Sequence, residues 1–219
     1  MKKLNVNTRG NAKLKNTDKV HFLIWNLPSQ TTCPYATDLC KKSCYAKRAE
    51  RYPSCKNSRQ QNYYDSLEYD FTLNMIYTIE LLINSNAIKG KKIYFRIHES
   101  GDFYNQEYFD KWLKVITYFE GYENLTFLAY TKSIPFLIGS TYAKNHFPTN
   151  FVIRSSIWSD TREDLFNLTF KYNLPIFTAL PNFEDYNHGK KFVECPGVNC
   201  GTCLKCYSWN YKDIAVKIH

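Results

Sequence analysis

From residue 92 onward, short apolar runs alternate with amphipathic segments, and this alternation restricts the fold of the chain more than any other feature of the sequence. Four of the runs have the length and composition of β-strands, namely Lys92–His98, Leu125–Tyr130, Asn150–Arg154 and Pro175–Thr178. The segments between them are expected to be helices, at Gln106–Phe119, Ile134–Lys144 and Arg162–Tyr172. Strand, helix, strand at this spacing predicts parallel βαβ units.

The regions on either side of this alternation complete the prediction of one α/β domain over residues 1–219. Val20–Trp25 and Ile214–Lys217 are apolar enough to add two strands to the four. Such a set fits a partial (β/α) barrel or an open, mostly parallel sheet with a C-terminal cysteine-rich appendage, and a doubly wound sheet is the alternative. Asn57–Asn84 is predicted to be helical. Residues 1–19 form a basic arm that is expected to be mobile or loosely docked.

Composition excludes several classes of protein. Hydrophobic residues make up 44% of the 219 residues, which is enough for a packed core and excludes a disordered or fibrous chain. The sequence has no uninterrupted apolar run of the roughly eighteen residues that a membrane span needs, so no membrane association is expected. Residues 1–20 are basic and polar and lack the apolar stretch of a secretory signal. The expected compartment is therefore the cytoplasm.

Four cysteines lie within twelve residues near the C-terminus, and they are Cys195, Cys200, Cys203 and Cys206. In a reducing cytoplasm, clustered thiols are more often metal ligands than disulfides. Their successive gaps of four, two and two residues resemble ferredoxin-type ligation more than a zinc ribbon, in which a longer loop separates two CxxC pairs. We therefore expect a 4Fe–4S cluster here, with zinc as the alternative metal.

A second group of cysteines, Cys33, Cys40 and Cys44, follows the first predicted strand. If Cys40 begins a helical turn, Cys44 lies one turn later on the same face. Three thiolates would hold a second 4Fe–4S cluster and leave one iron open to another ligand, as catalytic metal sites do. The alternatives are zinc held by these thiols and a histidine, or plain buried cysteines. Cys55 is expected to be a small buried residue rather than a fourth ligand.

Charged and polar residues follow three of the predicted strands at their carboxyl ends, where α/β barrels and open sheets gather their catalytic groups. The candidate catalytic residues are Arg96, His98, Glu99, Asp102 and Lys132. The candidate cofactor-binding residues are Tyr45, Ser100, Arg154 and Ser155. Arg96 and His98 share a face at the period of two, so both are expected to point into the barrel mouth, which the open iron would also face. In the structural alternative, Arg96 pairs with Glu99 or Asp102, and His98 is a satisfied core histidine.

The net charge of +9 has two interpretations. Lysine and arginine in excess favour a phosphate-bearing partner such as nucleic acid. A composition biased toward Lys, Asn, Ile, Tyr and Phe explains the same charge without a partner. Basic and aromatic residues alternate at Arg59–Tyr64 and Trp209–Lys212, where they would stack on bases or simply fill the core.

Several short motifs resemble the phage gene product 88 family. They are Cys40-x3-Cys44-Tyr45-Ala46, the Arg51-Tyr-Pro stretch with Arg59 and Asn62, Ser100–Phe103, Tyr130–Ser133 and the terminal cysteine cluster. The resemblance runs from about Cys33 to Cys206 and implies a phage protein in the host cytoplasm.

The three-cysteine group continued by Tyr45-Ala46 is also similar, more loosely, to the radical S-adenosylmethionine superfamily. That resemblance implies a partial α/β barrel and S-adenosylmethionine as a second cofactor. The cysteine gaps here are six and three residues, where the superfamily usually has three and two, and the chain has no clear Gly-Gly-Glu stretch.

Two functions of different classes follow from these features. The first is an iron–sulfur enzyme of radical S-adenosylmethionine type that acts on a nucleotide, a nucleic acid or a peptide and needs an electron donor. The second is a non-catalytic nucleic-acid-binding protein that the metal clusters stabilise. A simple electron carrier is disfavoured, because 219 residues with several polar strand ends exceed what that role needs.

Overall fold

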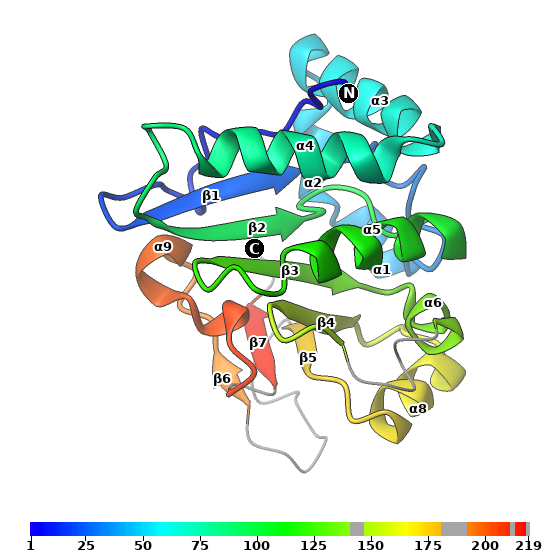
Figure 1. Cartoon of the computed structure of the whole chain (residues 1–219). Helices are drawn as coiled ribbons and strands as arrows, with labels where there is room; N and C mark the ends of the chain where they lie inside the picture. Colours follow the sequence, from blue (N-terminus) through cyan, green and yellow to red (C-terminus); the bar gives the residue numbers. More distant parts are fainter. Residues whose placement is uncertain (141–146, 181–191, 211–212, 218–219) are drawn as a thin grey trace.

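The computed structural model describes residues 1–140, 147–180, 192–210 and 213–217, and within them the chain forms a seven-stranded parallel sheet that curls into an open half-barrel (Figure 1). The strand order is β1-β2-β3-β4-β5-β7-β6. The strands are β1 (Val20–Trp25), β2 (Lys92–Ile97), β3 (Leu125–Thr131), β4 (Phe151–Ile157), β5 (Ile176–Leu180), β6 (Val193–Glu194) and β7 (Ile214–Lys217). The predicted α/β fold with a parallel sheet is confirmed.

Helices cover the outer face of this sheet. α4 and α5 lie over β1 to β3, and α6 and α8 continue the layer beside β4 and β5 (Figure 1). The helices are α1 (Asp38–Lys42), α2 (Tyr45–Ala49), α3 (Pro53–Leu67), α4 (Phe71–Ile83), α5 (Gln106–Tyr118), α6 (Ile134–Gly139), α8 (Glu163–Lys171), α9 (Cys200–Cys203) and the 3₁₀ helix η2 (Lys205–Tyr207). None of those in the described part of the chain is long and apolar enough to cross a membrane.

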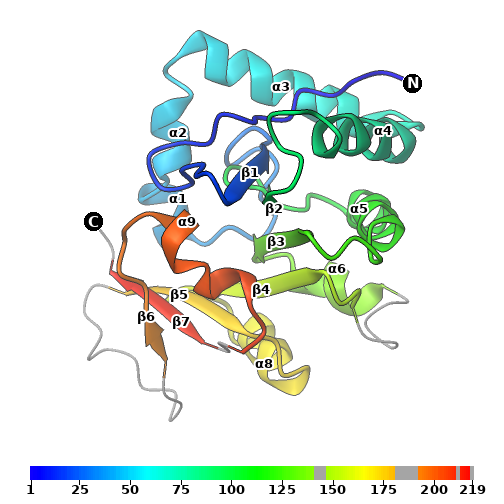
Figure 2. The same ribbon diagram turned by 60° about the vertical axis from the view of Figure 1, so that its left-hand side comes forward.

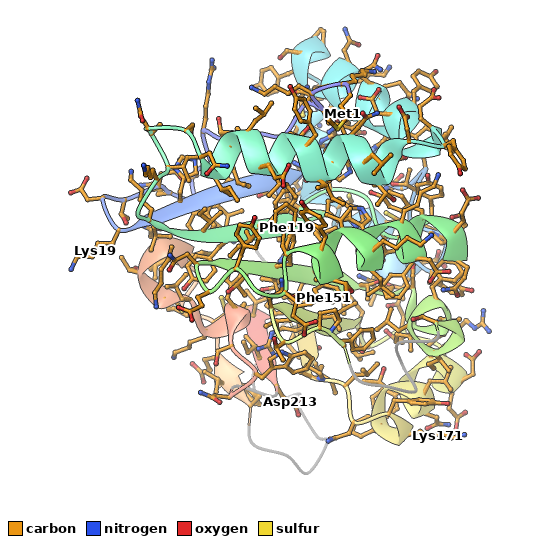
Figure 3. All side chains as sticks on the ribbon, in the orientation of Figure 1. Met1, Lys19, Phe119, Phe151, Lys171 and Asp213 are labelled. Atoms are coloured by element: carbon orange, nitrogen blue, oxygen red, sulfur yellow. The ribbon has the colours of Figure 1, made fainter. Side chains whose placement is uncertain are left out.

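The main core lies between the sheet and the outer helices. Trp25, Phe95 and Phe127, from β1, β2 and β3, are fully buried there against α4 and α5. Phe119, just after α5, and Phe151, at the start of β4, belong to the same layer (Figure 3). Successive residues of a strand point to opposite faces, so these side chains account for only one face of the sheet.

The inner face of the half-barrel is also buried, and the C-terminal segment covers it. Phe22 and Ile24 of β1, Leu128 of β3 and Val152 of β4 form a second apolar cluster with Tyr207 of η2. Figure 2 shows α9 and η2 lying on this concave side of the sheet. Burial of both faces explains why the strands are nearly continuous apolar runs in the sequence.

The predicted helix over Asn57–Asn84 is two helices, α3 and α4. The chain leaves the helical conformation at Glu68, whose ψ is 145°, and Tyr69 is 98% exposed. The two halves bury different surfaces: α4 packs its apolar side on the sheet, whereas α3 is polar and buries Asn62 and Asp65. A single straight helix could not pack on both of these surfaces at once.

Two other predicted boundaries differ from the structure. The predicted helix Ile134–Lys144 is present as α6, and residues 141–144 lie outside the described residues. β6 was not predicted, because a strand of two residues has no alternating pattern to detect.

The basic arm of residues 1–19 is docked rather than loose. Leu4 is buried and its backbone N donates to Thr78 Oγ1 on α4 at 2.8 Å. Asn7 forms an antiparallel bridge with Ile24 of β1. Leu14 joins the inner apolar cluster, so the arm reaches from the outer helices to the inner face of the sheet.

Candidate metal centre

The C-terminal cysteine segment folds as one helical turn and a 3₁₀ turn on the inner face of the sheet (Figure 2). Its cysteines lie in order along it, with Cys195 after β6, Cys200 and Cys203 at the two ends of α9, and Cys206 in η2. Asn199 caps α9, because its Oδ1 accepts a hydrogen bond from the Gly201 backbone N at 2.9 Å. A Cβ at Gly201 would lie 2.7 Å from the carbonyl oxygen of Lys15, so glycine permits the arm to pack this closely.

Arg154 fastens this segment to the sheet. The side chain is fully buried, and its Nε donates to the Cys206 carbonyl at 3.0 Å. Its Nη2 donates to the carbonyl oxygens of Ser208 at 2.7 Å and Lys205 at 3.4 Å. A planar guanidinium suits this role, since it presents several donors in a fixed fork. Arg154 was predicted to bind a cofactor at the barrel mouth, and the structure instead places it beneath the cysteine segment.

The four C-terminal thiols are close enough to affect one another's ionisation. Burial, together with the neighbouring Cys206, Cys195 and Cys203, raises the pKa of Cys200 to about 11. Burial likewise raises the pKa of Cys206, although Arg154 and Arg96 oppose that change. In the described part of the chain, no three cysteine, histidine or carboxylate side chains stand close enough together to hold a metal ion as they are oriented.

The first cysteine group lies on a loop and two short helices. Thr37 caps α1 by accepting a hydrogen bond from the Cys40 backbone N at 3.2 Å. α1 ends at Lys42, and Cys44 takes an extended backbone with ψ of 101° before α2 begins. The expectation that Cys40 and Cys44 share one helical face is therefore wrong, because the helix is broken between them.

The loop that carries these cysteines is held over the carboxyl ends of the strands from both sides. Tyr45 Oη donates to the carbonyl of Glu99, just after β2, at 2.7 Å. On the other side, Asp160, which follows β4, accepts a hydrogen bond from the Leu39 backbone N at 2.8 Å. Cys33 lies near Asp102 and Lys132, and burial followed by the Asp102 charge raises the pKa of Cys33 to about 12. The predicted location of this group at the mouth agrees with these contacts.

Asp102 and Lys132 have separate partners at this edge of the sheet. Asp102 is buried and accepts hydrogen bonds from Thr131 Oγ1 at 2.6 Å and from the Lys132 backbone N at 2.9 Å, so it joins the ends of β2 and β3. Lys132 Nζ donates to Ser156 Oγ at 2.8 Å and lies over the Trp158 ring. The ammonium group thus projects from β3 across the end of β4.

Arg96 is buried on β2 and stacks on Tyr130 of the neighbouring strand β3. Its guanidinium carbon lies 3.7 Å from the centre of the Tyr130 ring, and its Nε donates to the His98 carbonyl at 3.3 Å. The side chain is 8% exposed, and among the described residues no carboxylate lies within salt-bridge distance of it. Its charge acts on the Cys200 and Cys206 thiols from one side and on the Tyr45 hydroxyl, next to Cys44, from the other.

The ion pairs proposed as the structural role of Arg96 are absent among the described residues. Glu99 interacts with Arg96 only at longer range, and its Oε1 accepts a hydrogen bond from Asn11 Nδ2 at 2.6 Å. Asp102 bonds to the end of β3 instead. Arg96 is therefore a buried cation that no carboxylate of the described residues approaches within salt-bridge distance.

His98 does not share the inner face with Arg96. Its φ is +60°, a left-handed conformation that interrupts the alternation of the strand. The ring packs against Phe103, and Nε2 forms a hydrogen bond with Tyr108 Oη at 2.9 Å on the outer side of the sheet. Burial and the Arg96 charge lower the pKa of His98 to about 3, so the ring is neutral. These contacts match the alternative of a core histidine in its burial, but only one ring nitrogen is satisfied, because the buried Nδ1 has no hydrogen-bond partner among the described residues.

Ser100 and Ser155, which were predicted to bind a cofactor, have other positions in the structure. Ser100 has a structural partner, and Ser155 faces away from the mouth. Ser100 Oγ donates to the Leu27 carbonyl at 2.9 Å and joins the chain after β2 to the chain after β1. Ser155 alternates with Arg154 and so faces the outer helices, where its hydroxyl is buried.

Two tyrosines of this site were not assigned from the sequence. Tyr130 stacks on Arg96, and Tyr207 packs on Tyr94 and Phe22 beneath the cysteine segment. Tyr130 could have been found, because it occupies the inward position of β3 two residues after Leu128. Tyr207 gave no such signal, since its contacts are all with residues distant in the sequence.

We expect Arg154→Met to lower the free energy of unfolding by about 3 kcal/mol, because three buried carbonyl groups lose charged donors. Denaturation by urea, followed by circular dichroism, measures this change. Arg162→Met is the matched control: Arg162 is 69% exposed and pairs only with Asp164 among the contacts described for its side chain, so its effect should stay within about 0.5 kcal/mol. Equal effects of the two substitutions would contradict the anchoring role.

We expect His98 to make stability fall in acid. The folded pKa of about 3 lies below the usual value of 6.5, so between these limits only the unfolded chain binds the proton. Stability should therefore decrease by up to about 1.4 kcal/mol per pH unit as the pH falls from 6.5 toward 3. His98→Asn, which tolerates the left-handed backbone, should show a shallower decrease in parallel urea titrations. If the free energy of unfolding depends on pH in the same way in the unchanged protein and in His98→Asn, then His98 is exposed or charged in the folded protein.

Comparison with known proteins identifies the family to which this chain belongs. The sequence profile described as "Gene product 88" matches residues 4–174, a range that includes the first cysteine group and ends before Cys195. The "Gene 88 protein" of Mycobacterium phage D29 is 30% identical over 106 residues, which is 46% of this chain and 42% of that protein. The matched region thus spans less than half the length of that relative. No solved structure matches. The chain belongs to the gene product 88 family of phage proteins.

Proposed function

We propose that this protein binds iron–sulfur clusters, with Cys195, Cys200, Cys203 and Cys206 holding one 4Fe–4S cluster and Cys33, Cys40 and Cys44 holding a second. The observation that carries the proposal is Arg96, a buried cation without a carboxylate partner among the described residues, whose charge acts on the Cys200 and Cys206 thiols and on Tyr45, the residue after Cys44. A buried charge is costly unless another charge balances it. Thiolates that hold a metal provide that charge.

The charges of the C-terminal site support this assignment. Without metal, burial raises the pKa of Cys200 and Cys206, so thiolates there are unfavourable. A bound metal deprotonates its thiols, and a 4Fe–4S cluster with four thiolates carries roughly −2 in its oxidised form. Arg96 and Arg154 stand beside Cys206 and would offset that charge. The donors are all sulfur, which suits iron–sulfur clusters or zinc rather than magnesium or calcium.

The first cysteine group supports a different kind of site. Three thiols on a loop above the strand ends would leave one iron with an open position that faces the mouth. A cluster with an open iron supplies electrons and a coordination site to a ligand bound beside it. Lys132 and Arg96 supply cations, and Ser156 adds a hydroxyl, so the ligand fits the class of small molecules that carry a carboxylate. S-adenosylmethionine, which carries a carboxylate, is the proposed second cofactor of a catalytic centre.

We expect protein purified without oxygen to be brown and to contain about eight irons and eight sulfides per chain. Cys200→Ser should lose about half of the iron and melt at a lower temperature, because metal binding contributes to folding. The matched control is Cys55→Ser: Cys55 lies on α3, outside both groups, and its loss should leave the iron content unchanged. Colourless protein with stoichiometric zinc would overturn the iron–sulfur assignment in favour of structural zinc sites.

We expect S-adenosylmethionine to change the electron paramagnetic resonance spectrum of the reduced protein through the open iron. Cys200→Ser, which keeps only the first cluster, isolates that signal. In this background Lys132→Ala should raise the concentration of S-adenosylmethionine needed for half of the spectral change by about tenfold, because one charged contact is lost. Lys114→Ala, an exposed lysine on α5, serves as the control. A spectrum that saturating S-adenosylmethionine leaves unchanged would contradict the open site.

A further inference from the structure

The helices beside the first cysteine group carry a dense patch of exposed cations. We name it the basic surface, and its residues are Lys41, Lys42, Lys47, Arg48, Arg51 and Lys56. Every one of these side chains is exposed. Residues 41–56 have a net charge of +5, against +9 for the whole chain, so a short segment holds more than half of the excess.

Acidic residues do little to neutralise the basic surface. Glu50 is the one acid within residues 41–56, and its carboxylate accepts hydrogen bonds from the buried Arg59 and from Ser29. Asp38, just before the segment, meets only Lys41, at 3.9 Å. Lys42, Arg48, Arg51 and Lys56 have no side-chain partner among the contacts of the described residues. The field of the surface therefore points outward, toward a polyanion.

Two exposed aromatic rings interrupt the basic surface. Tyr45 is 61% exposed and Tyr52 is 71% exposed. The Tyr45 hydroxyl is already bonded to the Glu99 carbonyl, so its ring is held in place. Protein surfaces that bind single-stranded nucleic acids combine aromatic rings with cations. Unpaired bases stack on the rings, and the cations neutralise the phosphates. Base pairs in a duplex do not offer their faces in this way.

The sequence pointed to other segments for this role. Arg59 is buried, where its Nη1 donates to the Ala46 carbonyl at 2.8 Å and to Glu50, so it supports α2 and does not face solvent. Trp209 and Asn210 are described, whereas Tyr211 and Lys212 lie outside the described residues. The exposed cations are on α1, α2 and the start of α3 instead.

We propose that the basic surface binds single-stranded nucleic acid and delivers one nucleotide to the mouth at Cys33–Cys44. Tyr45 follows Cys44 directly and lies against Glu99 at the end of β2, so a strand that stacks on it reaches the strand ends. Asn11 of the arm bonds to the same Glu99, and the exposed Lys13 and Lys15 follow it in the chain as further cations. Binding to this surface does not depend on the metal centre, whereas the delivery step rests on the proposed function.

Fluorescence anisotropy with a labelled 20-nucleotide oligothymidylate tests the proposal, using the full chain purified without oxygen. Six phosphate contacts predict that log Kobs falls with log[salt] with a slope of about −4. The variant K42Q/R48Q/R51Q/K56Q should reduce that slope by about 3 and weaken binding at least tenfold at low salt. Tyr52→Ala should weaken binding roughly tenfold with the slope unchanged, because it removes stacking and no charge.

The matched control, K89Q/K92Q/K114Q/K171Q, removes the same charge from exposed lysines on α5, on α8 and before or at the start of β2. It should bind within twofold of the unchanged protein. Equal losses in the two fourfold variants would overturn the proposal, because binding would then follow net charge alone. A duplex that binds as tightly as the single strand, or binding to phosphatidylserine vesicles without binding to the oligonucleotide, would overturn it as well.

Iron analysis of each variant separates this inference from the proposed function. The fourfold variant of the basic surface should keep the iron content of the unchanged protein, so that its weaker binding reports the surface itself. Cys200→Ser should keep the salt slope while it loses iron. If the unchanged protein holds its iron but does not bind the oligonucleotide, the basic surface is contradicted. If it binds the oligonucleotide but contains no iron, the metal centre is contradicted.

Discussion

A parallel sheet that curls without closing has an inner face that must be covered, and this constraint organises the rest of the structure. The outer face follows the ordinary rule, with α4 and α5 packed on it. The inner face has no helix from a βα unit available, and the C-terminal cysteine segment covers it with Tyr207 and Leu204. The segment was expected to be an appendage. It is part of the core, and Arg154 connects it to β4.

The sheet could be predicted because its signal is local. Both faces of the strands are buried, so each strand is an apolar run, and the helices between them show their own period. The break between α3 and α4 could not be predicted in the same way. Residues 68–70 contain no glycine or proline, and the chain turns there because the two helices pack on different surfaces. That reason lies in tertiary structure and not in the segment itself.

In the candidate site, too, the features set by local sequence patterns could be predicted, and those set by tertiary contacts could not. Spacing alone grouped the cysteines, and period two correctly placed Arg96 on the inner face. The same rule failed at His98, where a φ of +60° turns the ring outward. Arg154 also faces inward, but its partners are the carbonyl groups of Lys205, Cys206 and Ser208, some fifty residues later, which no local pattern identifies. The alternation of residues along a strand determines which face of the sheet a side chain points to. The partner of that side chain depends on which segment of the protein covers that face of the sheet.

The position of η2 and α9 has a consequence for biosynthesis. A ribosome makes β1 to β5 before the segment that covers their inner face, because the covering residues 200–207 follow β5 in the sequence. During that interval Phe22, Ile24 and Leu128 lack their final apolar cover and offer a surface for aggregation. The inner face of β1 to β4 can therefore be covered only after residues 200–207 have been made. If thiol ligation accompanies that docking, the supply of metal sets how long the nascent sheet stays uncovered.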